Sequence, residues 1–283
     1  MILSFTCYPY GSISHALEIN SYKTYNPPLI DGFSIDPVWQ KASIVVAKDK
    51  VTGIPIHIQS AYNSDTIFFL ISFPDNDESR NHKSWKWNPN RNMYTVGKDR
   101  EDIFVIKWNM EKEEKNLSIY ADNLYKTDVW YWKACRTDPA GYADDKYHVL
   151  STAEAIDATK LVSSSGNTHY LYRNEDTGKA AYKTVLQMEF QGDIVPRYTN
   201  QSPTDSRADV IAKGRWQNNK WTIEFARPLQ TGHQDDVQFE PGEKYQFGVS
   251  RYEIAGRPPN QSLSQPLYGT GDINESITLH FAK

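Results

Sequence analysis

Short apolar segments with a two-residue period, separated by polar turns, are the feature that most constrains the fold of this chain. Residues 66–73 (TIFFLISF) are almost entirely apolar, which is typical of a central strand covered on both faces. In residues 54–61, isoleucine alternates with other residue types, as expected for a half-buried strand. About ten such segments, with little helical periodicity, predict an all-β fold, an antiparallel β-sandwich with long loops.

The connections between these segments include one tight turn and one long loop. Residues 217–220 (QNNK) lie between two alternating segments and predict a hairpin turn, because asparagine tolerates a positive φ angle. Residues 74–95 are rich in Asn, Asp and Pro, and we expect an irregular loop that contacts a partner. A short helix is expected around residues 153–158. Residues 17–283 are predicted to form a single domain, since β-sandwiches of this length are commonly one unit.

The charge and the missing motifs exclude several function classes. With 31 basic and 35 acidic residues the formal charge is −4, which disfavours a nucleic-acid partner. No apolar run reaches the roughly 18 residues that span a bilayer, so no transmembrane segment is expected. The chain has two cysteines without CxxCH or CxxC spacing, which excludes covalent c-type haem attachment and a ferredoxin-type cluster. No matched general acid and base is found, so no catalytic residue is predicted.

Residues 1–16 (MILSFTCYPYGSISHA) have an apolar start and end in Ser-His-Ala, which is similar to a small-x-small cleavage site. They lack the positively charged start of a complete secretory signal. We interpret them as a truncated signal peptide, with an ordered N-terminal arm as the alternative. The mature protein is then expected in the periplasm or an equivalent extracytoplasmic compartment, with Cys135 as its single cysteine.

Residues 128–145 (DVWYWKACRTDPAGYADD) concentrate aromatic and charged side chains. Trp130 and Trp132 lie beside Lys133 and Arg136, and the segment ends in two aspartates. Aromatic bulk next to fixed cations suits a flat, anionic and mostly apolar ligand. The alternative is a strand with a buried tryptophan stripe that ends in a polar loop, because strands are rich in aromatic residues.

This segment resembles part of the haem-binding gamma-subunit family of ethylbenzene dehydrogenase and related molybdenum oxidoreductases, including nitrite oxidoreductase-like complexes. Residues 30–42 (IDGFSIDPVWQKA) and 100–108 (REDIFVIKW) resemble the same family. The resemblance implies a sandwich of the carbohydrate-binding-module or DOMON type that binds haem b without a covalent bond. It also implies a non-catalytic electron-transfer subunit, which takes electrons from the iron–sulfur subunit of a molybdenum enzyme and passes them to a soluble cytochrome.

A methionine and a lysine are the axial ligands that the resemblance implies for the haem iron. We expect Met110, which ends the strand that matches the family, and Lys213, which lies among apolar residues. A lysine can bind iron only when deprotonated, which a dry pocket favours. Trp130, Trp132 and Arg136 are expected to contact the macrocycle.

Other residues could take the same roles. Lys133 is the second candidate for the lysine, although it could instead pair with Asp144 or with a haem propionate. Met93 is the second candidate for the methionine, whereas Met188 is interpreted as part of a strand core. His148 and His169 are alternative axial ligands, but each more often would be an ordinary strand residue.

Two other functions remain open on the residues alone. Family members often carry a histidine between the two tryptophans, where this chain has Tyr131. This departure leaves room for a haem-free subunit that helps to assemble the same complex. A carbohydrate-binding module is the third possibility, with Trp85 and Trp87 as its aromatic platform.

No metal site is predicted from the remaining polar residues. The histidines are scattered without HxH or HExxH spacing, so zinc is unsupported. Asp144 with Asp145, and Asp235 with Asp236, are pairs that could bind calcium. Two adjacent acids without the full loop pattern are weak signals, and we interpret both pairs as solvated.

Overall fold

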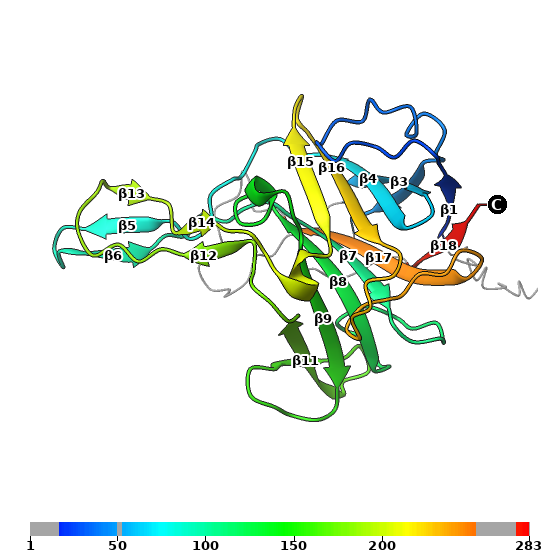
Figure 1. Cartoon of the computed structure of the whole chain (residues 1–283). Helices are drawn as coiled ribbons and strands as arrows, with labels where there is room; N and C mark the ends of the chain where they lie inside the picture. Colours follow the sequence, from blue (N-terminus) through cyan, green and yellow to red (C-terminus); the bar gives the residue numbers. More distant parts are fainter. Residues whose placement is uncertain (1–16, 50–52, 253–275, 283) are drawn as a thin grey trace, which may run out of the picture.

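The computed structural model describes residues 17–49, 53–252 and 276–282, and in these residues twelve strands form one hydrogen-bonded path, with a thirteenth strand paired beside it (Figure 1). The path folds into two layers that face each other across a shared core. The expected all-β sandwich is confirmed. The predicted signal peptide, residues 1–16, lies outside the described residues. The described part of the chain contains no helix long and apolar enough to cross a membrane.

The first layer has the strand order β10–β11–β9–β8–β7–β17–β18, and all of its pairs are antiparallel. Its strands are β7 (Ile103–Asn109), β8 (Tyr125–Lys133), β9 (Asp144–Ser151), β10 (Thr159–Val162), β11 (Thr168–Glu175), β17 (Lys244–Tyr252) and β18 (Ile277–Phe281). The family-like segment 128–145 therefore begins in β8, near the middle of this layer, and ends in β9.

The second layer has the order β3–β4–β16–β15, and β2 pairs with the free edge of β3. Its strands are β2 (Val45–Lys48), β3 (Pro55–Tyr62), β4 (Thr66–Pro74), β15 (Ile211–Trp216) and β16 (Lys220–Pro228). Strand β1 (Leu17–Lys23) joins the layers, because it pairs in parallel first with β18 and then with β3. These two parallel pairs depart from the expected all-antiparallel arrangement.

Aromatic rings from both layers fill the space between them. The ring of Phe69 on β4 lies 5.6 Å from that of Trp108 on β7 and 6.0 Å from that of Trp130 on β8. Trp132 on β8 meets Trp221 on β16 edge-on at 4.9 Å. Because all five side chains are fully buried, the chain's own rings occupy this part of the interior.

The predicted hairpin turn, short helix and long loop differ in how well they agree with the structure. Asn218 and Asn219 both have a φ angle of 54°, so the predicted β15–β16 hairpin turn is confirmed. Residues 153–158 form bends and turns instead of a helix, and Ile156 is exposed with no surface to pack against. The predicted loop 74–95 is only partly irregular, because it contains β5 (Trp85–Asn88) and the start of β6 (Met93–Val96).

Two small sheets project from one side of the sandwich and form an arm (Figure 1). One has the order β13–β5–β6 and the other pairs β12 with β14. The strands are β5 (Trp85–Asn88), β6 (Met93–Val96), β12 (Tyr182–Thr184), β13 (Ile194–Val195) and β14 (Tyr198–Asn200). The described helical turns are η1 (Asp138–Ala140) and η2 (Asp205–Ala208).

The outer face of β4 is covered as well, as its apolar composition predicts. Phe68 and Leu70 pack against Val38 and Trp39, which belong to the family-like segment 30–42. The inward side chains of the same strand lie in the main core. Strand β4 is therefore buried on both faces, and the segment 30–42 serves as its outer cover.

Glu224 on β16 anchors this cover to the sheet. Its carboxylate accepts hydrogen bonds from the indole N–H of Trp39 at 2.7 Å and from the backbone N–H groups of Asp31 and Gly32 at 3.0 and 2.8 Å. Burial raises the pKa of Glu224 to about 7, although these three donors favour the ionised form. Deprotonation at this site therefore opposes folding.

The pH dependence of stability tests this anchor with Glu224→Gln. The pKa of Glu224 is raised on folding, so its contribution to stability is lost as the pH rises through about 7. Glutamine does not titrate, but its amide places an N–H group against one of the three donors. This unfavourable contact should lower the free energy of unfolding by about 1–3 kcal/mol. We expect the variant to be less stable in urea unfolding at low pH, with a deficit that shrinks as the pH rises. Glu189→Gln, at an exposed residue, is the control, and a constant deficit would contradict the assignment.

Candidate functional site

The two tryptophans of segment 128–145 belong to the core. Trp130 packs against Trp108 at 5.3 Å and Trp132 against Trp221 at 4.9 Å, measured between ring centroids. Both indoles are fully buried. They pack against the chain's own aromatic residues and therefore leave no slot for a planar ligand beside them. Of the two interpretations of this segment, the buried tryptophan stripe agrees with the structure.

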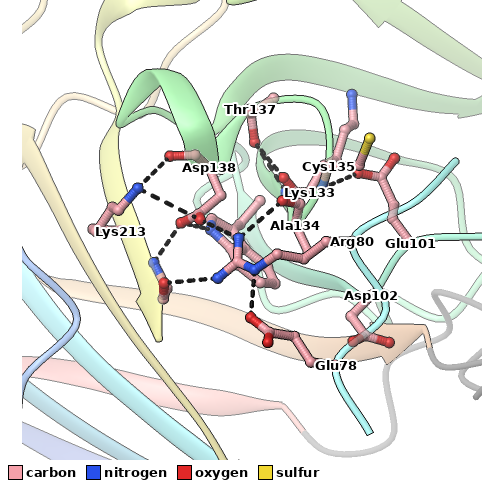
Figure 2. A network of polar contacts seen from close by, with 12 residues as sticks. Glu78, Arg80, Glu101, Asp102, Lys133, Ala134, Cys135, Thr137, Asp138 and Lys213 are labelled. Carbon is pink, nitrogen blue, oxygen red and sulfur yellow. Dashed lines mark hydrogen bonds and ion pairs between the residues drawn. The ribbon is translucent and has the colours of Figure 1, made fainter. Parts of the chain in front are cut away.

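Asp138 in η1 organises the polar residues next to this stripe (Figure 2). Its carboxylate accepts hydrogen bonds from Arg80 at 2.6 Å, from the indole of Trp132 at 3.0 Å and from the backbone of Gly214 at 2.5 Å. Lys213 donates to the carbonyl oxygen of Asp138 at 2.9 Å. The predicted apolar setting of Lys213 is wrong, because its amine is held by a backbone carbonyl and lies near a carboxylate.

Lys133 is buried and ion-paired. Its amine lies 2.5 Å from a carboxylate oxygen of Asp144, whose other oxygen lies 2.5 Å from Arg207. Burial lowers the pKa of Lys133 while Asp144 opposes this change. Burial would raise the pKa of Asp144, but Lys133, Lys146 and Arg207 hold it well below its usual range. Of the alternatives for Lys133, pairing with Asp144 is therefore the one in the structure, and the expected solvation of Asp144 is wrong.

Arg136 is also committed to an internal partner. Its guanidinium pairs with Glu101, which further accepts the backbone N–H groups of Cys135 at 2.7 Å and Arg136 at 3.0 Å. The guanidinium lies over the rings of Tyr182 and Tyr198, at 5.3 and 5.6 Å from their centroids. The cations of this segment thus neutralise buried carboxylates and tie β8 to its neighbours.

The structure does not bring the two predicted axial ligands together. Met110 directly follows β7, and its backbone N–H donates to Lys126 at the start of β8. Lys213 instead contacts Asp138, beyond the opposite end of β8. With roughly 3.3 Å per residue, strand β7 separates these two ends by about 20 Å. One iron therefore cannot bind both side chains in this arrangement.

Met110 lines an open cavity of about 740 Å³ at its end of the sandwich. This volume lies within the range of roughly 300–1,000 Å³ that is typical of small-molecule sites. Val237 and Tyr245 give the cavity apolar surface, and the lysines at its wall are Lys112 and Lys244. The thioether of Met110 is a donor type that suits a haem iron, whereas Lys112 and Lys244 are exposed and lack the dry setting that a lysine ligand requires. Several carboxylates also line the wall, which makes it more polar than the predicted pocket.

The other predicted ligands lie elsewhere. Met93 is half-exposed on β6, and Met188 is 87% exposed, so its expected place in a strand core is wrong. His148 on β9 and His169 on β11 are buried strand residues. Burial lowers the pKa of His148 well below its usual range, which keeps its imidazole neutral.

Trp85 and Trp87, the predicted sugar platform, are occupied by internal contacts. The guanidinium of Arg197 lies over the ring of Trp85 at 4.7 Å from its centroid. The indole N–H of Trp85 donates to the carbonyl of Val185 at 2.6 Å. Trp87 meets the ring of Phe190 edge-on at 5.1 Å. The two indoles therefore hold the arm together and do not form a free stacking surface.

A cluster of buried acids was missed by sequence reasoning. Asp128, Asp145 and Asp236 bring their carboxylates within 4.8 Å of one another, next to the guanidinium of Arg227. The expected solvation of Asp145 and Asp236 is wrong, because both are buried. Burial raises the pKa of Asp128 to about 7, since Arg227 offsets only part of this effect. The adjacent acids were visible in the sequence, but their distant partner was not.

Gly214 tests the packing around Asp138. A Cβ atom at this position would lie far inside van der Waals contact with ring carbon Cζ2 of Trp132. We expect Gly214→Ala to destabilise the protein by about 1–3 kcal/mol, because the buried ring has no space to move. Urea unfolding measures the loss, and Trp132→Phe is the companion change that removes the overlap. The double variant should lose less free energy of unfolding than the two single variants lose together. Fully additive losses would contradict the contact.

Two solved structures similar to this chain share little sequence identity with it. No curated protein matches the sequence. A family 9 carbohydrate-binding module from Caldicellulosiruptor kristjanssonii, solved in complex with glucose, is 11% identical, and the match covers 94% of this chain and 97% of that chain with a TM-score of 0.40. A putative carbohydrate-binding protein from Bacteroides uniformis is 7% identical, with 94% and 100% of the two chains covered and a TM-score of 0.43.

The family model described as ethylbenzene dehydrogenase matches residues 30–256. This range contains the cover segment 30–42, the end of β7 with Met110, and the whole segment 128–145. It spans most of the 283 residues, and it is the family that the three sequence segments resemble. The chain belongs to the ethylbenzene dehydrogenase family.

Proposed function

We propose that the protein is a non-catalytic, gamma-type subunit of an extracytoplasmic molybdenum oxidoreductase. Family membership supports an accessory role beside molybdenum and iron–sulfur subunits. In this role the subunit binds haem b and passes electrons on to a soluble cytochrome. Two surfaces are required, one that holds the complex together and one that holds the cofactor, and the structure offers a separate candidate for each.

The arm is the candidate surface for the partner subunits, and its exposed apolar side chains are the observation that carries the proposal. It presents large apolar residues at 50–87% exposure: Met93, Val96, Leu186, Met188, Phe190 and Ile194. Apolar side chains gathered on one projecting element are characteristic of a protein interface. The predicted loop 74–95 supplies part of this surface through β5 and β6. Burial of the arm against a partner would remove this surface from water.

The cavity beside Met110 is the candidate site for haem. Met110 packs against the main core and offers its thioether at the cavity wall. Met110 would be the iron ligand that this cavity supplies, because the lysines of its wall, Lys112 and Lys244, are exposed. Bound haem would supply reversible one-electron transfer at the iron. The protein's own part is to hold the group near the surface, where a cytochrome can approach.

A haem-free subunit of the same complex is the alternative. It is favoured by the aromatic rings that fill the described interior and by the internal pairing of Lys133 and Arg136. Such a subunit would use the arm in the same way and would serve assembly alone. The two functions differ in a single observable property, which is the binding of haem.

Titration with haem distinguishes these functions. We expect the purified protein to take up one equivalent of haem b and to show a low-spin Soret band on reduction. Met110→Ala should change this low-spin spectrum, because it removes the thioether from the cavity wall. Met93→Ala, on the arm, is the matched control and should leave the spectrum unchanged. The absence of any Soret band in the wild-type protein would favour the haem-free subunit.

Co-purification tests the arm independently of haem. Met188→Asp combined with Phe190→Asp places two charges on the exposed apolar surface, and we expect association with the molybdenum and iron–sulfur subunits to weaken by about tenfold or more. Ile156→Asp is the control, because this residue is 91% exposed on a loop outside the arm. Size-exclusion chromatography of the co-expressed subunits measures the change. Equal recovery of the complex with both variants would contradict docking through the arm.

A further inference from the structure

Three buried carboxylates from separate parts of the chain converge near the end of the sandwich that carries Met110. Asp128 lies on β8, Asp145 on β9, and Asp236 in the connection between β16 and β17. Each can place one carboxylate oxygen within 4.8 Å of the others, and all three side chains are at most 6% exposed. Two of the three therefore stand on neighbouring strands of a rigid sheet, which holds their spacing constant.

The nearest cation does not balance this cluster. Arg227 lies 2.8 Å from Asp128 and 3.0 Å from Asp236, and its guanidinium is fully buried. Asp145 accepts a hydrogen bond from the backbone N–H of Lys146 at 3.2 Å. When all three carboxyl groups are ionised, one guanidinium leaves two negative charges on buried side chains. Unbalanced buried charge is costly, and one divalent cation would cancel it.

The carboxylate oxygens also lack donors. Oδ1 of Asp128, Oδ2 of Asp145 and Oδ1 of Asp236 are buried and accept no hydrogen bond from the described residues, whereas Oδ2 of Asp236 faces Arg227. A buried oxygen without a donor loses the free energy of its hydration shell and gains nothing in return. Metal coordination satisfies such oxygens, because a hard cation takes the place of the missing donors.

We propose that Asp128, Asp145 and Asp236 bind one hard divalent cation, and that this cation is calcium. Carboxylate oxygens are the donors that calcium prefers, and the described cluster offers it neither thiolate nor imidazole. Asp236 lines the open cavity, which gives the ion an entrance and leaves room for water to complete its coordination. The bound ion joins β8, β9 and the connection that follows β16.

A neighbouring pair extends the site on the other side of Asp236. Nδ1 of His233 lies 2.6 Å from Asp209 and 3.9 Å from Asp236. An imidazole that is held by one carboxylate can orient the next one, as groups around a metal commonly do. Both residues of this pair are partly exposed, in contrast to the buried carboxylates. The cation site is separate from the haem proposal, since it requires neither the thioether nor a lysine.

Metal titration of the full chain tests this site. The protein is stripped with EDTA, dialysed into metal-free buffer and titrated with CaCl₂ in a calorimeter, with MgCl₂ and MnCl₂ in parallel. We expect one calcium per chain and a rise in melting temperature on calcium addition, because the ion binds only the folded state. Asp145→Asn and Asp236→Asn should each abolish the heat of binding and the rise in melting temperature. Glu113→Gln is the control, because this carboxylate is 86% exposed.

The same variants distinguish a metal site from a purely structural acid cluster. With EDTA present, Asp145→Asn removes one unbalanced charge and should be at least as stable as the wild type. With calcium present, the same variant should melt below the wild type. A variant that shifts the melting temperature equally in both buffers would overturn the proposal. So would a wild-type chain that binds none of the three ions, since protonation would then balance the cluster.

Discussion

A buried guanidinium links the two layers of this sandwich. Arg227 extends from β16 in one layer to Asp128 on β8 in the other, and it also donates to the carbonyl of Val237 at 3.0 Å. Its charge lies between the rings of Trp130 and Phe239, at 5.4 and 5.5 Å from their centroids. Burial opposes its charge, but the surrounding carboxylates raise the pKa of Arg227 and keep it protonated. Packing of both layers therefore depends on a cation that is satisfied only when the acids are in place.

Between Asp128 and Asp145, the family-like segment follows the same rule. Its acids and cations pair with one another or with groups on neighbouring strands, as in the contacts of Lys133 with Asp144 and of Arg136 with Glu101. Side chains that are committed to such contacts are not free to bind a ligand. The segment is thus the polar framework of the fold, and the surfaces proposed for function lie elsewhere, on the projecting arm and at the cavity beside Met110.

The resulting arrangement separates three tasks in space. The arm carries the apolar surface proposed for partner subunits, the cavity is the proposed haem site, and the acids around Arg227 supply the proposed cation site. Asp236 connects the last two, because it belongs to the acid cluster and also lines the cavity. A cation held there would strengthen the wall of the cavity without taking part in electron transfer.

Local patterns alone were enough to establish the all-β class, the double burial of β4 and the β15–β16 hairpin. Each of these depends on neighbouring residues, through the alternation of side chains or the φ angle that asparagine tolerates. The family was also readable, because its three segments are contiguous. In contrast, the distance between Met110 and Lys213, and the meeting of Asp145 with Asp236, depend on which strands pair and in what register. Strand pairing joins residues far apart in the chain, and a two-residue period contains no record of the partner, so only the folded chain determines where such side chains meet.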